Sequence, residues 1–236
     1  MRKGLIGLAI IIAAIITIAF GYFFFQYRFY TKEDPTKWED DIKAIEARTA
    51  GSPLKGRAVV FIGSSSILKW ESLERDMDPV PVIRHGFGGS RIKDSTWFVP
   101  RLVTAYHPPA VVLYAGDNDI YFRDLFGAKP DTAGQCLEDF KVFVAAVHRD
   151  LPRIRIYFVS IKPSVDRMKF WPQMKAANEL IRDFCARDPR LAYIDIATPM
   201  IAGDGTPRGE YFLADGLHLN EAGYWLWTSI IKPVLQ

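Results

Sequence analysis

Apolar and polar positions along this chain form blocks that predict parallel strands separated by helices. Candidate strands lie at 58–62, 80–84, 110–114, 154–160 and 191–196. Those at 110–114 and 154–160 are near-continuous apolar runs, as expected of strands buried on both faces. Segments with an apolar residue every three or four positions, typical of helices that cover a sheet, lie at 67–75, 92–106, 132–150, 173–187 and 221–234. This alternation predicts an α/β fold, a three-layer α/β/α sandwich on a five-stranded parallel sheet with right-handed crossovers.

A longer apolar stretch precedes the alternating part. Residues 4–25 include no charged side chain, and a helix of that length spans about 33 Å, enough to cross a hydrocarbon core of about 30 Å. We therefore expect an uncleaved transmembrane signal anchor over 1–30. A cleavable signal peptide is the alternative, because Arg2 and Lys3 precede the run, but the run exceeds the roughly 7–15 apolar residues of a usual signal peptide.

The rest of the chain divides at a linker. Basic residues flank the expected anchor on both sides, but a short leading tail usually stays in the cytoplasm. We therefore expect a single-pass membrane protein with its main domain on the extracytoplasmic side. A linker and a packing helix with an apolar face are expected over 31–54, and the main domain over 55–236.

Charge and composition exclude several classes of partner. The net charge is only +3 and no basic run of five or more residues occurs, so nucleic acid is not an expected partner. The two cysteines, Cys136 and Cys185, both fall in predicted helices and are expected to be buried thiols rather than a disulfide. The four histidines lack zinc-ligand spacing. We expect no metal and no cofactor.

The residues with useful chemistry follow the predicted strands. Gly63 ends the first apolar run, and three serines at 64–66 stand before the helical pattern. A strand-to-helix turn suits a nucleophile, because the unpaired N–H groups and the dipole at a helix start favour negative charge there. The alternative is a serine-rich helix cap.

Two further loops offer hydrogen-bond donors. The segment 85–91 holds three glycines, which allow close backbone approach to an oxyanion, although it also fits an ordinary turn. The segment 115–119 contains Asn118, whose amide can donate to an oxyanion. Asp117 and Asp119 could suggest a divalent-metal site, but no further ligand cluster in the sequence supports one. Hydrogen bonding to the loop backbone is their plainer role.

A carboxylate and a histidine lie just before the last predicted helix. Asp215 precedes His218 by three residues across a glycine. The carboxylate can reach the ring Nδ1–H and fix the tautomer, which leaves Nε2 as a base for a serine hydroxyl. Such a pair is also common in structural roles.

Taken together and in this order, the four loops resemble the SGNH (GDSL-like) hydrolase family over nearly all of the chain after the expected anchor. The family's first block, usually Gly-Asp-Ser, falls on 63–65, and its second-block glycine falls on Gly89. Its Gly-x-Asn-Asp block falls on 116–119 and its closing Asp-x-x-His on Asp215 and His218. The resemblance implies the flavodoxin-like SGNH hydrolase fold and a serine esterase or lysophospholipase.

The same resemblance assigns roles to individual residues. It implies that Ser65 is the nucleophile, His218 the base and Asp215 the residue that orients the base. The oxyanion hole would consist of the N–H groups of Ser65 and Gly89 and the amide of Asn118. The chain departs from the family at position 64, where a serine replaces the usual aspartate in a Gly-Ser-Ser-Ser variant. This change leaves the triad intact but weakens any inference of substrate from GDSL lipases.

Side chains near these loops are candidates for substrate binding. Those expected to bind substrate are His85, Tyr121, Arg167 and Trp171. Neighbouring aromatic and apolar residues could form an acyl pocket, a membrane-facing rim or a surface that stacks on sugars, namely Phe122, Phe126, Met168 and Phe170. Arg123 and Lys169 could meet a phosphate or an acidic glycan.

Three functions remain open at the level of sequence. The first is hydrolysis of an acyl ester of a lysophospholipid, another lipid or a carbohydrate. The second is acyl transfer, in which a sugar hydroxyl replaces water as the acceptor. The third is a membrane-anchored binding module without catalysis, against which the complete Ser65, Asp215 and His218 set argues.

Overall fold

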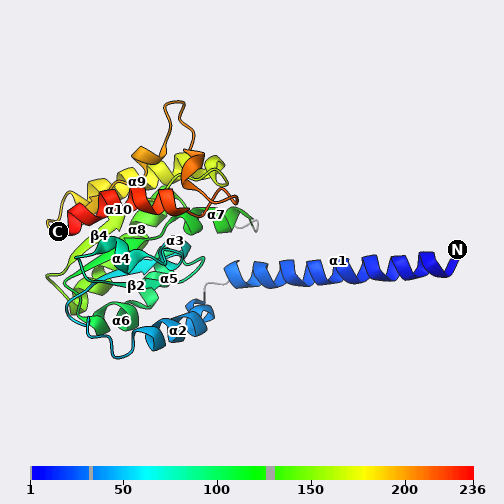
Figure 1. Ribbon diagram of the computed structural model, residues 1–236, viewed down its shortest axis with the longest axis horizontal. Coiled ribbons are helices and arrows are strands. Elements are labelled where there is room, and N and C mark those ends of the chain that lie inside the picture. The colour runs from blue at the N-terminus through cyan, green and yellow to red at the C-terminus, as the bar shows by residue number, and fades with distance from the viewer. Residues whose placement is uncertain (1, 32–33, 126–130) are drawn as a thin grey trace.

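A five-stranded parallel sheet forms the centre of the computed structural model, with helices on both of its faces (Figure 1). The structure describes residues 2–31, 34–125 and 131–236, and their side chains over 10–25, 34–121 and 131–236. The strands are β1 (Val59–Gly63), β2 (Val82–Gly86), β3 (Ala110–Tyr114), β4 (Arg155–Val159) and β5 (Leu191–Ile194). The predicted α/β fold with a five-stranded parallel sheet is confirmed.

The strand order, β2-β1-β3-β4-β5, places β1 and β3 side by side at the middle of the sheet. The chain winds from β1 outward to β2, and then from β3 outward to β4 and β5 in the opposite direction. Gly63 pairs with Gly86 on one side and with Tyr114 on the other, so three strands end at one level. Ligand sites in open α/β sheets lie beyond the carboxyl ends of the strands at such a reversal.

The helices divide into two layers. One face of the sheet packs against α2 (Glu39–Thr49), α5 (Ile92–Trp97), α6 (Val99–Leu102), α8 (Ala133–Asp150) and α9 (Trp171–Cys185). The other face packs against α3 (Ser65–Leu68), α4 (Leu73–Met77) and α10 (Glu221–Leu235). The remaining elements near the sheet are α7 (Asp117–Leu125) and the short 3-10 helices η1 (Pro35–Trp38), η2 (Thr104–Tyr106), η3 (Met168–Phe170), η4 (Thr198–Met200) and η5 (Gly209–Tyr211).

Burial on both faces explains the continuous apolar runs of the strands. In β1, Val60 and Ile62 belong to the core beneath the first helical layer, and Val59 and Phe61 to the core beneath the second. Every residue of β1 and β3 is buried. Cys136 and Cys185 are buried free thiols in α8 and α9, as expected.

Two helices predicted as continuous are interrupted. The segment expected over 67–75 forms α3 and α4, with the fully buried Trp70 between them. The segment expected over 92–106 forms α5, α6 and η2. Pro100 lies in the first turn of α6, and its missing N–H cannot continue the ladder of α5. The helix α7 was not expected at all.

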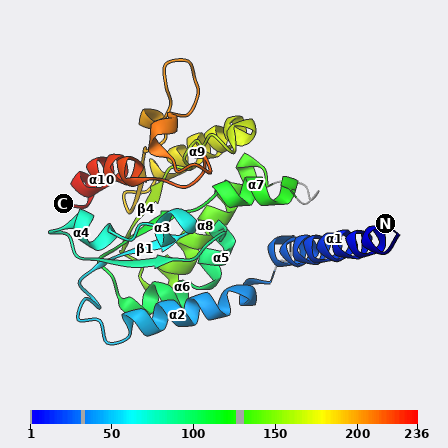
Figure 2. The same cartoon turned by 45° about the vertical axis from the view of Figure 1, so that its right-hand side comes forward.

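The N-terminal helix α1 (Arg2–Thr31) projects away from the sandwich in both views (Figures 1 and 2). Its described apolar side chains, over 10–25, are exposed. Judged on the side chains that the structure describes, no helix is both long and apolar enough to cross a membrane. The transmembrane helix predicted over 1–30 is therefore not supported by the structure.

Candidate active site

Ser65 is the first residue of α3, directly beyond the carboxyl end of β1. The turn depends on Gly63, whose φ of +145° is rare for other residues. A Cβ at Gly63 would lie 1.9 Å from the carbonyl oxygen of Tyr114. The same carbonyl accepts the N–H of Ser64 at 3.0 Å. The turn therefore requires glycine at 63, and it presents Ser65 at the edge of the sheet.

The helix that begins at Ser65 is only four residues long. Its dipole is correspondingly small, so the helix dipole expected from the sequence adds little at this position. At this helix start, the N–H of Ser65 itself remains as a donor to negative charge. Ser64, at the position where the family usually has aspartate, is fully buried.

His218 approaches Ser65 from the loop before α10. Its Nε2 lies 3.2 Å from Ser65 Oγ, and its Nδ1 lies 2.7 Å from Asp215 Oδ2. Asp215 Oδ1 accepts the backbone N–H groups of Leu217 and His218, each at 2.9 Å. The three side chains predicted as a triad thus form one hydrogen-bonded line.

The negative charge of Asp215 determines which ring nitrogen of His218 carries the proton. Burial alone would raise the pKa of Asp215, but hydrogen bonds from the His218 ring and from the N–H groups of His218 and Leu217 lower the pKa to about 2. The carboxylate accepts the proton on Nδ1 of His218. The lone pair of Nε2 then faces Ser65 Oγ and can take its proton.

The donors predicted for the oxyanion hole lie in neighbouring loops. Gly89 has φ of +75° in the loop after β2, and Asn118 lies in the first turn of α7 after β3. Asn118 Nδ2 donates to the carbonyl of Ser90 at 3.0 Å, which ties the two loops together. Because the amide nitrogen carries two protons, a second proton remains for another acceptor. Within the described part of the chain, the N–H groups of Ser65 and Gly89 have no hydrogen-bond acceptor.

A buried charge network lies behind Asn118. Asp117 Oδ2 accepts from Lys162 Nζ and from Arg167 Nη1, each at 3.2 Å. Burial would raise the pKa of Asp117, but the charges of Lys162 and Arg167 lower it below its ordinary value. Lys162 also donates to the hydroxyl of Tyr114 at 3.2 Å. The carboxylate is therefore held ionised between two cations beneath the loop that carries Asn118.

Arg167 has a different position from the one expected. It is 3 % exposed, and its Nη1 donates to Asn118 Oδ1 at 3.0 Å as well as to Asp117. A guanidinium so deeply buried cannot meet a substrate in this conformation. The structure gives no support to the prediction that Arg167 binds substrate, and its contacts instead orient the Asn118 amide.

His85 is buried as well. The residue has no exposed surface, its Nδ1 lies 2.6 Å from the carbonyl of Leu102, and its ring packs edge-on against Tyr106. Burial lowers the pKa of His85 to about 4. The expectation that His85 lines the pocket fails because β2 ends at Gly86, two residues later than predicted. His85 therefore lies inside the strand and points to the core.

The two aromatic candidates are partly exposed. Tyr121 packs over the Arg167 guanidinium, with 4.0 Å from Cζ to the ring centroid, and edge-on against Phe170 at 5.6 Å. Trp171 begins α9 and packs against the core. The side chains of Phe122, Arg123 and Phe126, which the sequence also suggested, lie outside the described residues.

Two of the candidate catalytic side chains are at least partly exposed. A groove of about 1000 Å³ lies between α4 and the start of α10, and it includes none of Ser65, His218 and Asn118 among its lining residues. The side chains of His218 and Asp215 are 19 % and 48 % exposed. A small acyl group could therefore reach Ser65 from the surface.

Lys162 is the functional candidate that the sequence interpretation missed. It lies three residues beyond the last residue of β4, Val159. A charged residue at the carboxyl end of a buried strand was the available signal, because such ends meet the same edge of the sheet as Ser65 and Asn118.

The sequence of this chain matches a known protein family. A sequence model of the GDSL-like lipase/acylhydrolase family matches residues 62–226. The chain is 26 % identical over 180 residues to the human platelet-activating factor acetylhydrolase IB subunit alpha1, covering 74 % of each chain.

Solved structures share the fold at lower identity. A GDSL-like lipase from Bacteroides thetaiotaomicron superposes with a TM-score of 0.65 at 17 % identity, over 86 % of this chain and 97 % of that one. An acetyl xylan esterase superposes with a TM-score of 0.62 at 20 % identity, over 76 % of this chain and 100 % of that one.

Proposed function

This chain belongs to the GDSL-like lipase/acylhydrolase family and is a hydrolase that acts on ester bonds, and we propose that it works as a serine esterase through Ser65, His218 and Asp215. The observation that carries the proposal is the hydrogen-bonded line from Ser65 Oγ through the His218 ring to Asp215. Ser65 and His218 stand 153 positions apart in the sequence. Only the fold brings a nucleophile and an oriented base together.

The proposed reaction has two steps. Ser65 Oγ attacks the ester carbonyl carbon while His218 Nε2 takes the hydroxyl proton, and the carbonyl electron pair moves to the oxygen. The intermediate then collapses, and the leaving alcohol takes the proton from His218. Water attacks the acyl-serine in the same manner, and the carboxylic acid departs as Ser65 regains its proton.

The oxyanion of each step would be held by three donors. These are the N–H groups of Ser65 and Gly89, which have no acceptor in the described chain, and the second amide proton of Asn118. Donors fixed before the reaction stabilise developing charge without reorganising, and one such donor is worth about 2.7–4 kcal/mol. The bond from Asn118 to Ser90 supports this role, because it holds the amide in place.

We favour a short acyl group, such as acetyl, on a lipid or carbohydrate alcohol. The names of the similar proteins, a platelet-activating factor acetylhydrolase subunit and an acetyl xylan esterase, support this choice. Tyr121 and Trp171 are partly exposed, so both remain candidates for contacts with the alcohol part of the substrate.

The test is a series of p-nitrophenyl esters from acetyl to palmitoyl, with Ser65→Ala as the matched control. We expect the highest kcat/KM at acetyl or butyryl and no turnover above background in Ser65→Ala. A maximum at long chains would favour a lysophospholipid or another lipid ester. Turnover by Ser65→Ala close to that of the unmodified protein would contradict the serine mechanism.

The acceptor of the acyl group needs a separate measurement. Product analysis with a sugar acceptor present distinguishes hydrolysis, which yields the free acid, from transfer, which yields an acylated sugar. We expect the free acid, because the exposed Asp215 and the partly exposed His218 leave the site accessible to water. Absence of any Ser65-dependent product would favour a binding module without catalysis.

We also retain the proposal that α1 attaches the protein to a membrane, with the catalytic domain on the extracytoplasmic side. Exposed isoleucine and phenylalanine side chains along 10–25 support it. The test is extraction of membranes at alkaline pH, followed by protease treatment of sealed cells. Retention in the membrane with cleavage from outside is expected, and release by alkaline extraction would contradict the attachment.

A further inference from the structure

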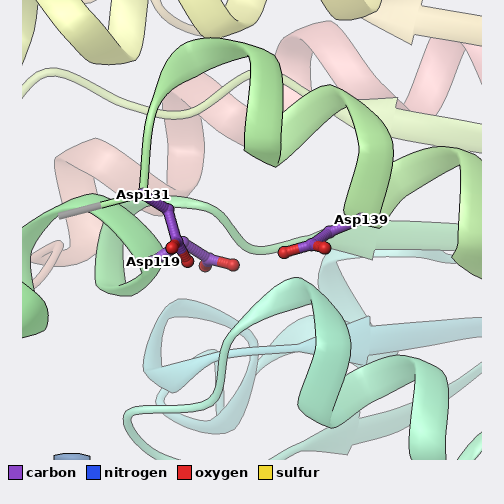
Figure 3. A group of neighbouring side chains, drawn as sticks. All are labelled: Asp119, Asp131 and Asp139. Atoms are coloured by element: carbon purple, nitrogen blue, oxygen red, sulfur yellow. The ribbon is translucent and has the colours of Figure 1, made fainter. Parts of the chain in front are cut away.

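Three carboxylates converge at the side of the molecule where α7 and α8 begin (Figure 3). This Asp119 cluster consists of Asp119 in the first turn of α7, Asp131 just before α8 and Asp139 within α8. One carboxylate oxygen of each residue lies within 4.8 Å of the others. The sequence suggested Asp119 only together with Asp117 as a possible metal site, because Asp131 and Asp139 lie 12 and 20 positions further along and meet Asp119 only in the fold.

The described part of the chain leaves one oxygen of Asp119 without a hydrogen-bond partner. The residue has no exposed surface, and its Oδ1 accepts the N–H of Ile92 at 3.1 Å. Its Oδ2 is buried and has no hydrogen-bond partner among the described residues. Figure 3 shows the carboxylate directed toward the other two. A buried carboxylate oxygen without a partner is costly, and a bound cation removes that cost.

Charged side chains of both signs act on the cluster within the described part of the chain. Arg91 and Lys93 both favour the ionised form of Asp139. Arg91 also forms a buried ion pair with Asp94, with Nε 3.3 Å from Oδ2. Asp131 and Asp139 repel the negative charge of Asp119, whereas Arg91 attracts it. A cation bound among the three carboxylates would relieve this repulsion.

We propose that Asp119, Asp131 and Asp139 bind a divalent cation, and that the cation is Ca²⁺. Carboxylate oxygens are the ligands that hard cations prefer. Two oxygens that each lie about 2.3–2.6 Å from one Ca²⁺ are separated by at most about 5 Å, which the 4.8 Å limit satisfies. Mg²⁺, with ligands at about 2.0–2.1 Å, needs oxygens within about 4.2 Å of each other and near-octahedral geometry.

The site would brace the loops that surround the candidate oxyanion hole. Asp119 follows Asn118 directly, and its Oδ1 holds the N–H of Ile92 in the segment that carries Gly89 and Ser90. Asp131 N–H donates to the carbonyl of Asp119 at 3.4 Å. A cation shared with Asp139 would fasten both segments to α8.

The experiment is thermal unfolding of the full-length protein after chelator treatment, with Ca²⁺, Mg²⁺ or Na⁺ added at equal ionic strength. At a Ca²⁺ concentration of about 100 times Kd, we expect Tm to rise by about 5–10 °C. Mg²⁺ should give a smaller rise and Na⁺ none. Calorimetric titration should find one Ca²⁺ site per chain.

Single substitutions of aspartate test whether Ca²⁺ binds at the Asp119 cluster. Asp139→Asn keeps the shape of a partly exposed side chain and should abolish the Ca²⁺-dependent rise in Tm. Asp150→Asn, in the last turn of the same helix and paired with Arg149, is the matched control and should keep the rise. If Asp139→Asn does not fold, Asp131→Asn replaces it. No rise in the unmodified protein, or an equal rise in Asp139→Asn, would overturn the proposal.

Discussion

Arg167 Nη1 donates to Asn118 Oδ1 at 3.0 Å, and this bond decides which end of the Asn118 amide faces the Ser90 loop. Oxygen and nitrogen of an amide have nearly the same shape, so packing alone does not fix its orientation. The positively charged Arg167 on the oxygen side fixes the orientation of the amide. The same guanidinium nitrogen also bonds Asp117, which keeps Arg167 in place.

Arg167→Met should therefore act through Asn118. The amide loses its fixed orientation, so we expect kcat on p-nitrophenyl acetate to fall about 10- to 100-fold, below the roughly 10²–10³ of losing a whole oxyanion donor. KM should change little, and Arg167→Lys should restore part of kcat. Lys162 still pairs with Asp117 in both variants, so both should fold. An effect on KM alone would indicate a role in binding substrate instead.

The loss of kcat on substitution should depend on the role of each proposed catalytic residue. Ser65→Ala and His218→Ala should lower kcat on the order of 10⁶-fold, and Asn118→Ala about 10²- to 10³-fold. Asp215→Ala should lie between these limits. Single-turnover kinetics with the acetyl ester measures the order. Ser229→Ala, exposed on α10, is the control and should retain full activity.

Gly63→Ala should prevent folding or reduce stability by at least about 3 kcal/mol. The new Cβ would lie 1.9 Å from the Tyr114 carbonyl oxygen, and the φ of +145° is itself strained for alanine. Gly56→Ala is the matched control, because Gly56 has φ of +77° but no atom within 4 Å of its Cβ position. It should cost about 1 kcal/mol. Urea unfolding measures the loss of stability in both variants. An equal loss in both would show that the contact with the Tyr114 carbonyl oxygen is not the cause.

His85 should make stability depend on pH. Its pKa is about 4 in the folded state against 6.5 as the ordinary value, so between these limits the unfolded chain binds more protons. Stability is therefore complete above pH 6.5 and falls as the pH drops toward 4. Linkage gives a loss of about 2 kcal/mol between pH 7 and pH 5.

The control for this linkage is His85→Asn. Asparagine can still donate to the Leu102 carbonyl, which Nδ1 of His85 faces at 2.6 Å, but it does not titrate. Urea unfolding at pH 7 and pH 5 should show a smaller pH dependence in the variant by about the same 2 kcal/mol. Equal pH dependence in both proteins would rule out His85 as the source.

The sheet and the residues around Ser65 could be predicted because both leave local signals. Strands buried on both faces are continuous apolar runs, and candidate residues follow them directly, as Ser65 follows β1 and Asn118 follows β3. The bond between His218 and Asp215 spans only three residues, so its spacing is visible in the sequence.

Contacts between distant loops could not be predicted, because no local pattern in the sequence indicates them. Arg167 and Asn118 are 49 positions apart, and their bond depends on how the chain after β4 crosses the start of α7. The interruption between α3 and α4 was also hidden, since Ile67, Trp70 and Leu73 are spaced as in a helix but are buried along a bent path.

The position of His218 along the chain has a consequence for synthesis on the ribosome. Ser65 emerges early and all five strands are complete by Ile194, yet the base and its carboxylate follow only at 215–218. A nascent chain that has already formed the sheet thus holds a nucleophile without a base to activate it. The proposed esterase would therefore stay inactive until synthesis has passed His218, however early its sheet assembles.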